Sequence, residues 1–211
     1  MERMLILNAS PRAPRSNSKS YAQMLAHAWG GPASYREVRA PGDFEALRRE
    51  AEQSAHLVLV FPLYADSLPV PLVRFLKDLE AHPLAARPVV SVVVNCGFLE
   101  PGQNDLAVEM VRLFCRRSGS PFGSALEIAS GEAILGTPFR FLVERACRRL
   151  ARAVRRGRHG LFRVTMPLPK WAFLRASDAY WAAYGRRFGV TVEQMSCCCI
   201  ESPIDKSLTT D

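Results

Sequence analysis

The sequence has little of what marks a membrane-bound or exported protein. Its longest nearly uncharged stretches, 57–65 and 89–99, fall well short of the roughly 20 residues that cross a bilayer. The apolar run at 4–7 is too short for a signal peptide and leads directly into turn residues. We therefore expect a cytoplasmic protein with no membrane partner.

Metal-binding and disulfide patterns are also missing. The sequence has no Cys-x-x-Cys pair, and its four histidines do not cluster at ligand spacing. Three of the six cysteines stand alone in apolar segments and three are adjacent at 197–199, and neither pattern is typical of a secreted disulfide framework. We predict no metal site and interpret the thiols as buried or incidental, although adjacent thiols can bind a soft metal or be modified.

Acidic residues are scarce in one segment only. The chain has 211 residues, 48% apolar and 23% charged, with a formal net charge of +8, which is typical of a soluble globular protein and excludes a disordered chain. Nine arginines and a single acid, Glu144, lie between Phe139 and Arg163, so this segment carries the whole excess charge. The arginines recur opposite an apolar stripe, which predicts an amphipathic helix. Because no aromatic residue interleaves the arginines at 145–156, we predict a solvated basic face and no nucleic-acid partner.

Short apolar runs alternate with helical periodicity along the first 160 residues. Strands are predicted at 4–7, 34–38, 56–61, 89–94 and 125–128, and helices at 21–29, 43–53, 70–79, 106–117 and in the arginine-rich segment. This alternation predicts an α/β protein: a doubly wound, five-stranded parallel sheet with helices on both faces. The almost wholly apolar runs at 56–61 and 89–94 fit central strands. We expect one domain at 1–160 and a C-terminal helical extension at 161–211.

Ligands on such sheets bind at the carboxyl ends of the strands, which directs attention to three loops. The first loop lacks the glycine-rich patterns of dinucleotide and P-loop sites, yet it offers four hydroxyls, the Asn17 amide and two arginines at a helix N-terminus. It suits a terminal phosphate monoester, with an ordinary Ser/Asn cap as the equal alternative. Three prolines stiffen the second loop, which presents Tyr64 to a planar ligand, and Gly97 in the third loop lets a ring approach the backbone.

The motifs at these three strand ends resemble one known family. They are Ser10-Pro11-Arg12 with Ser16-Asn17-Ser18, then Pro62-Leu63-Tyr64, then Asn95-Cys96-Gly97-Phe98-x-Glu100. Over about residues 4 to 155 the chain is similar to the flavodoxin-like NAD(P)H-dependent FMN reductases, which include quinone reductases. Asn8 stands where many members have glycine. The compact cysteine motif of the related iron–sulfur flavoproteins is missing, which excludes that subgroup.

The resemblance implies an FMN-dependent oxidoreductase that transfers hydride from NAD(P)H to a quinone-like or other small-molecule electron acceptor. The residues that would hold the FMN phosphate are Ser10, Arg12, Ser16, Asn17 and Ser18. Those that would line the isoalloxazine are Pro62, Leu63, Tyr64 and Ala65, and those that would meet its pyrimidine end are Asn95, Cys96 and Gly97. Glu132 would border the substrate opening. Because the flavin carries the chemistry, no residue is assigned as a general acid or base.

The C-terminal part is similar to an extension found in some members of the family. Its aromatic residues, between 171 and 184, would pack on the sheet or on a partner subunit, and we expect a homodimer or a higher homo-oligomer. Two alternatives remain open. One is a flavodoxin-type one-electron carrier, although such carriers usually offer an acidic docking surface. The other is a flavodoxin-like module that has lost flavin and interacts through the arginine-rich helix.

Overall fold

The computed structural model describes residues 2–39 and 41–197. They fall into two compact units, the first ending at Pro167 and the second beginning at Leu168. The strands of the first unit are β1 (Met4–Asn8), β2 (Ala33–Glu37), β3 (His56–Pro62), β4 (Val89–Asn95), β5 (Phe122–Ile128) and β6 (Leu161–Val164). Its α-helices are α1 (Asn17–Trp29), α2 (Phe44–Glu52), α3 (Val70–Ala81), α4 (Asp105–Ser118) and α5 (Arg140–Arg155). Short 3-10 helices lie at Pro41–Asp43, Pro101–Asn104 and Ile134–Gly136.

All six strands run parallel, in the order β2-β1-β3-β4-β5-β6. The chain moves outward from β1 to β2 and then returns to the other side of β1 to form β3. Where the direction of winding reverses, the connections after neighbouring strands lead to opposite faces of the sheet and leave a crevice at the carboxyl edge. Asn8, Pro62 and Asn95 end β1, β3 and β4 at this edge.

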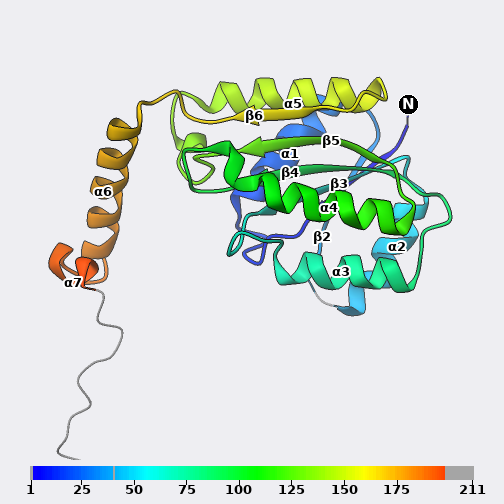
Figure 1. Cartoon of the computed structure of the whole chain (residues 1–211), viewed down its shortest axis with the longest axis horizontal. Helices are drawn as coiled ribbons and strands as arrows, with labels where there is room; N and C mark the ends of the chain where they lie inside the picture. Colours follow the sequence, from blue (N-terminus) through cyan, green and yellow to red (C-terminus); the bar gives the residue numbers. More distant parts are fainter. Residues whose placement is uncertain (1, 40, 198–211) are drawn as a thin grey trace, which may run out of the picture. The chain divides into compact units, whose positions relative to one another are not determined.

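Helices cover both faces of the sheet. α1 and α5 pack together on one face, and α2, α3 and α4 lie on the other (Figure 1). Because alternate strand residues face opposite layers, Leu59 and Phe61 of β3 join the same buried cluster as Phe75 of α3. Phe75 also meets Phe44 of α2 edge to face, with the ring centroids 5.3 Å apart. Burial of each such side chain contributes about 2–3 kcal/mol, which anchors the helices to the sheet.

The sheet has six strands, so the prediction of five is wrong. β6 is a four-residue edge strand that pairs with β5 and lies in the segment counted with the arginine-rich helix. Leu161 and Arg163 are exposed and Val164 is buried, so this strand has no continuous apolar run to mark it in the sequence. The pairing extends the sheet past residue 160, and the second unit begins at Leu168.

α5 has the two faces predicted from its periodicity. Val143, Leu150 and Val154 are buried, whereas the exposed side carries Arg145, Arg148, Arg149 and Arg152. Arg155 differs from these arginines because it has a structural role. Its guanidinium donates to the backbone carbonyl of Trp29 and lies over the indole ring, 5.1 Å from the centroid. This contact joins the ends of α1 and α5.

The second unit is helical, as predicted, and contains α6 (Lys170–Arg186) and α7 (Val192–Ser196). Tyr180, Trp181, Tyr184 and Phe188 form an aromatic cluster with ring centroids 5.2 to 6.2 Å apart. That these rings pack on the sheet or on a partner subunit stays a prediction. Of the adjacent cysteines at 197–199, the first is exposed and the other two lie outside the described residues.

The described part of the chain has neither a candidate membrane-spanning helix nor a candidate metal cluster. Within residues 2–39 and 41–197, no helix combines the length and apolar character needed to cross a membrane. In the same part of the chain, no group of three or more His, Cys, Asp or Glu side chains is arranged to hold a metal ion.

Candidate functional site

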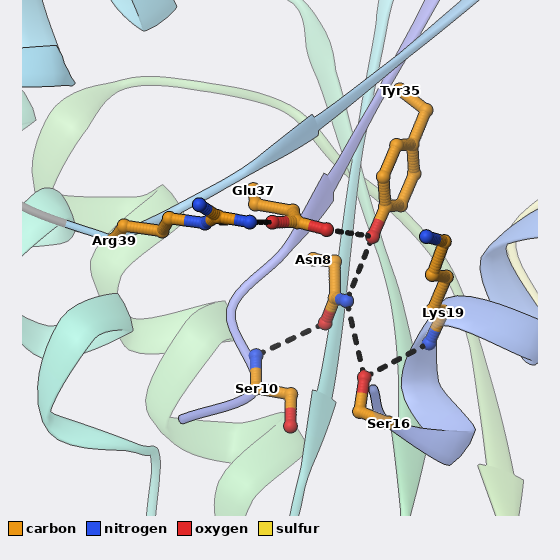
Figure 2. Close-up of polar contacts among 7 residues, drawn as sticks. All are labelled: Asn8, Ser10, Ser16, Lys19, Tyr35, Glu37 and Arg39. Atoms are coloured by element: carbon orange, nitrogen blue, oxygen red, sulfur yellow. Dashed lines mark hydrogen bonds and ion pairs between the residues drawn. The ribbon is translucent and has the colours of Figure 1, made fainter. Parts of the chain in front are cut away.

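The first loop, between β1 and α1, is built around the buried side chain of Asn8 (Figure 2). Asn8 Oδ1 accepts the backbone N–H of Ser10 at 3.0 Å, and Asn8 Nδ2 donates to Ser16 Oγ at 3.3 Å. Ser16 caps α1, because its Oγ also accepts the backbone N–H of Lys19 at 3.3 Å. One side chain therefore holds the beginning and the end of the loop.

Three hydroxyl oxygens of this loop accept hydrogen bonds from the protein itself. Ser10 Oγ accepts the backbone N–H of Arg12 at 3.3 Å, Ser16 Oγ accepts the two bonds described above, and Ser18 Oγ accepts Asn95 Nδ2 at 3.0 Å. In the described part of the chain none of the three hydroxyls has an acceptor for its own hydrogen, so all three can donate to an anion. Ser10 and Ser18 are buried, and Ser16 is the more accessible.

The start of α1 adds backbone donors to these hydroxyls. The first N–H groups of a helix have no intrahelical acceptor, and Ser16 satisfies only that of Lys19, which leaves those of Asn17 and Ser18 for a ligand. Arg12 is exposed on the same loop, and residues 9–20 contain no acidic residue. Hydroxyl donors, free N–H groups and a guanidinium without a carboxylate fit a phosphate group.

Asn17 has a contact that the sequence did not predict. Its Nδ2 donates to the backbone carbonyl of Gly131 at 3.0 Å, and Tyr21 Oη donates to the same oxygen at 2.6 Å. The Gly131 N–H donates to the Cys96 carbonyl at 2.7 Å. A Cβ on Gly131 would lie 3.1 Å from Asn95 Cβ and from Cys96 O, so a larger residue would displace this turn. Burial raises the pKa of Tyr21 and keeps its hydroxyl protonated as the donor. The turn after β5 is thus joined to the first and third loops.

The side chains that end β4 are directed into the protein. Asn95 Nδ2 donates to the Phe61 carbonyl at 3.0 Å as well as to Ser18, so both amide hydrogens are engaged. The buried thiol of Cys96 accepts Asn104 Nδ2 at 3.3 Å, and burial raises its pKa. Asn95 and Cys96 therefore position the third loop through contacts inside the protein.

The backbone of Gly97 is the open part of this loop. Gly97 is exposed, and a Cβ placed on it would meet no atom within 4 Å, which leaves room for a flat ring. At the same edge, Pro62 and Leu63 are half-buried, and the Leu63 N–H donates to the Asn95 carbonyl at 2.7 Å. The second and third loops are therefore joined beside Gly97.

The second loop contains a tight turn. Tyr64 and Ser67 exchange backbone hydrogen bonds of 3.0 and 3.1 Å. Ala65 and Asp66 between them have φ values of 48° and 54°, and positive φ at both central positions defines a type I′ turn. Side chains other than glycine, asparagine and aspartate rarely adopt this region, so Ala65 is strained there. The turn holds the Tyr64 ring outward, with 58% of the residue exposed.

Glu132 is exposed next to Gly131, on the turn after β5. Its charge contributes to the raised pKa of Tyr21, after burial and two cysteines. A role at the substrate opening stays a prediction.

Sequence reasoning missed a buried carboxylate near the site. Glu127 on β5 is 0% exposed, and its Oε2 accepts Arg163 Nε of β6 at 2.7 Å. Arg163 also pairs with Asp105 at the start of α4. Burial raises the pKa of Glu127 to about 7, with Arg163 opposing the rise and Asp105 adding to it. An acid within a mostly apolar strand was the available signal, because a buried carboxylate needs a partner.

Comparison with known proteins identifies the fold. No family model and no curated protein matches the sequence. Three similar solved structures show what the chain resembles. An NAD(P)H:quinone oxidoreductase from Methanothermobacter marburgensis has a TM-score of 0.58 at 13% identity, covering 72% of this chain and 96% of that chain. An FMN-dependent NADH-azoreductase from Bacillus anthracis, in complex with FMN, has a TM-score of 0.53 at 13% identity, covering 72% and 100%. A flavodoxin from Streptococcus pneumoniae TIGR4 has a TM-score of 0.54 at 16% identity, covering 73% and 98%.

The first unit therefore has a flavodoxin-like fold. This confirms, at the level of the fold, the resemblance drawn from the three motifs. The similar structures are two oxidoreductases and a flavodoxin, so the chemistry of this chain has to be argued from its own residues.

Proposed function

We propose that this chain is an FMN-dependent oxidoreductase that takes hydride from NAD(P)H and delivers it to a quinone-like or other small-molecule acceptor. The observation that carries the proposal is the first loop. It presents three hydroxyls free to donate and two free backbone N–H groups at the switch point of a flavodoxin-like sheet. A terminal phosphate satisfies these donors, and the azoreductase with the same fold was determined with FMN.

The residues divide between binding and positioning. Ser10, Ser16 and Ser18 would donate to the phosphate through their hydroxyls, and Arg12 would add charge from the exposed side of the loop. Asn17 would donate mainly through its backbone N–H, since one hydrogen of its amide is engaged with the turn after β5. These donors hold the phosphate end and leave the strand edge for the ring.

The ring would lie at the edge formed by the second and third loops. Leu63 and Tyr64 would contact it from one side, and the open backbone of Gly97 would let it approach closely. When bound, the flavin supplies the hydride-transfer chemistry. Asn95 would act on the ring indirectly. Its amide, at the end of β4, donates to Phe61 of β3 and to Ser18 of α1, and so fixes the positions of the second and third loops that would hold the ring.

A second candidate function is a one-electron carrier, because a flavodoxin is among the similar structures. The exposed arginines of α5 argue against an acidic docking surface on that side. The hydride hypothesis therefore remains the better one.

Anaerobic rapid mixing of the FMN-loaded protein with NADH and with NADPH tests the proposal. We expect at least one of the two to bleach the flavin absorbance, and a quinone added next to restore it. If neither bleaches the flavin and dithionite reduces it in two separate one-electron steps, the carrier hypothesis is the better one. A protein that cannot be loaded with FMN would be the flavin-free module.

The proposal also covers the oligomeric state, the cellular location and the macromolecular partners. We propose a cytoplasmic homodimer or higher homo-oligomer with no nucleic-acid or membrane partner. Sedimentation velocity of the loaded protein measures its mass, and a monomer at all concentrations would contradict the proposed assembly.

A further inference from the structure

A chain of hydrogen bonds leads from the edge strand β2 to the cap of α1 (Figure 2). Besides its bond to Ser16, Asn8 Nδ2 donates to Tyr35 Oη at 2.9 Å. Tyr35 Oη donates to Glu37 Oε1 at 3.1 Å, and Glu37 Oε2 accepts Arg39 Nε at 2.7 Å. Asn8 is completely buried, and the side chain of Glu37 is only 12% exposed. The network is therefore partly shielded from water: Tyr35 and Ser16 are half-buried, and Arg39 is exposed.

The groups at the two ends of this hydrogen-bond network determine which atom donates in each bond. The Glu37 carboxylate, paired with Arg39, can only accept, so the hydroxyl hydrogen of Tyr35 must point to Glu37. The oxygen of Tyr35 then accepts from Asn8. Independently, the backbone N–H of Ser10 can only donate, so the atom of Asn8 that faces it must be Oδ1. Both constraints turn the Asn8 amide the same way, with its two hydrogens toward Tyr35 and the helix cap.

This arrangement determines how the Ser16 hydroxyl can form hydrogen bonds. Its Oγ accepts one hydrogen from Asn8 and one from the Lys19 backbone, which uses both of its lone pairs. The hydroxyl hydrogen has no acceptor in the described part of the chain, and the residue is half-buried. The only hydrogen-bonding role left to this hydroxyl is donation.

We propose that Asn8 is a positioning residue which, with Tyr35 and Glu37, forces the Ser16 hydroxyl to donate to the phosphate of FMN, so that the loop selects FMN over riboflavin. This inference rests on the proposed function. The pairing of Glu37 with Arg39 also keeps an unbalanced negative charge away from the phosphate.

The isosteric variant Asn8→Asp reverses the direction of these bonds. Its carboxylate still accepts from Ser10, but it also accepts from Ser16, which turns the serine hydrogen inward and places a negative charge beneath the phosphate. We expect the Kd for FMN to rise by about 10- to 100-fold, the worth of one charge-assisted hydrogen bond. The Kd for riboflavin, which has no phosphate, should stay within about twofold of the parent value.

Tyr35→Phe removes the hydroxyl that links Asn8 to Glu37 and adds no charge. Asn8 then loses one partner and its amide is less firmly oriented, so we expect a smaller rise of about three- to tenfold in the Kd for FMN. Two matched controls exchange the same groups elsewhere. Gln53→Glu makes the amide-to-acid change before β3, at the opposite edge of the sheet, and Tyr180→Phe removes a hydroxyl in the second unit. Neither control should alter the Kd for FMN.

Quenching of flavin fluorescence measures each Kd, and circular dichroism verifies that each variant is folded. If Asn8→Asp does not fold, Asn8→Gly replaces it. We then expect the Kd for FMN to rise about threefold or more and the Kd for riboflavin to stay unchanged. An unchanged Kd for FMN in the Asn8 variants, or equal changes for FMN and riboflavin, would overturn the inference and leave the proposed function standing. Failure of the parent protein to bind either flavin would instead overturn the proposed function.

Discussion

Glu127→Gln should remove a large pH dependence from the stability of the first unit. Glu127 is buried on β5, and its pKa rises from the usual 4.5 to about 7 in the folded protein. An acid with a raised folded-state pKa holds its proton more tightly in the folded state than in the unfolded state. Its contribution is therefore largest below pH 4.5 and is lost as the pH rises to about 7. This rise in pKa corresponds to about 3 kcal/mol of unfolding free energy.

Urea denaturation of the parent and the variant, from pH 5 to 8, measures the effect. The parent should lose stability over this range relative to Glu127→Gln, because the glutamine does not titrate. Its side-chain oxygen can still accept from Arg163, so the contact between β5 and β6 is retained. Glu109→Gln, at an exposed ion pair on α4, is the control and should leave the pH profile of the parent unchanged. Parallel profiles for the parent and Glu127→Gln would refute the reasoning.

Three further outcomes are expected. Replacing Ser16 and Ser18 together by alanine removes two of the proposed phosphate donors and should raise the Kd for FMN at least about tenfold, measured by fluorescence titration; an unchanged Kd would contradict the phosphate assignment. Replacing Arg148 and Arg152 by glutamine should leave the rate of flavin reduction unchanged, because both are exposed on α5. Tight, sequence-selective nucleic-acid binding by the parent at physiological salt would contradict the solvated-face interpretation of that helix. Phe75→Ala should lower the unfolding free energy by about 3–5 kcal/mol in urea, and a loss below about 1 kcal/mol would place Phe75 outside the core.

Much of the fold could be predicted because local pattern and burial agree. The runs at 56–61 and 89–94 are apolar throughout, and they form the central strands β3 and β4, covered on both faces. The helix periodicities locate α3 and α4 to within a few residues of their observed bounds. The edge strand β6 could not be found in this way. β6 is held in the sheet by its pairing with β5 and by the contact of Arg163 with Glu127. Neither interaction produces a recognisable pattern within residues 161–164 themselves.

The candidate site, like the fold, was only partly predictable from the sequence. A parallel sheet brings the carboxyl ends of its strands to one edge, so the sequence alone was enough to select the three loops and the serine-rich character of the first. It could not show what individual side chains contact. Asn17 and Asn95, expected to touch the ligand, use amide hydrogens to hold neighbouring loops, and Tyr21 was not selected at all.

The sequence by itself determined the class of fold, the loops that meet at the carboxyl edge of the sheet, and the supply of hydrogen-bond donors in the first loop, because these depend on local periodicity and residue type. Only the tertiary structure decided how those donors are oriented. Asn8 meets Tyr35 because β2 returns beside β1, and Asn17 meets Gly131 across 114 residues because α1 lies under the turn after β5. Hydrogen-bond direction depends on which groups face each other in space, and strand order sets those neighbours.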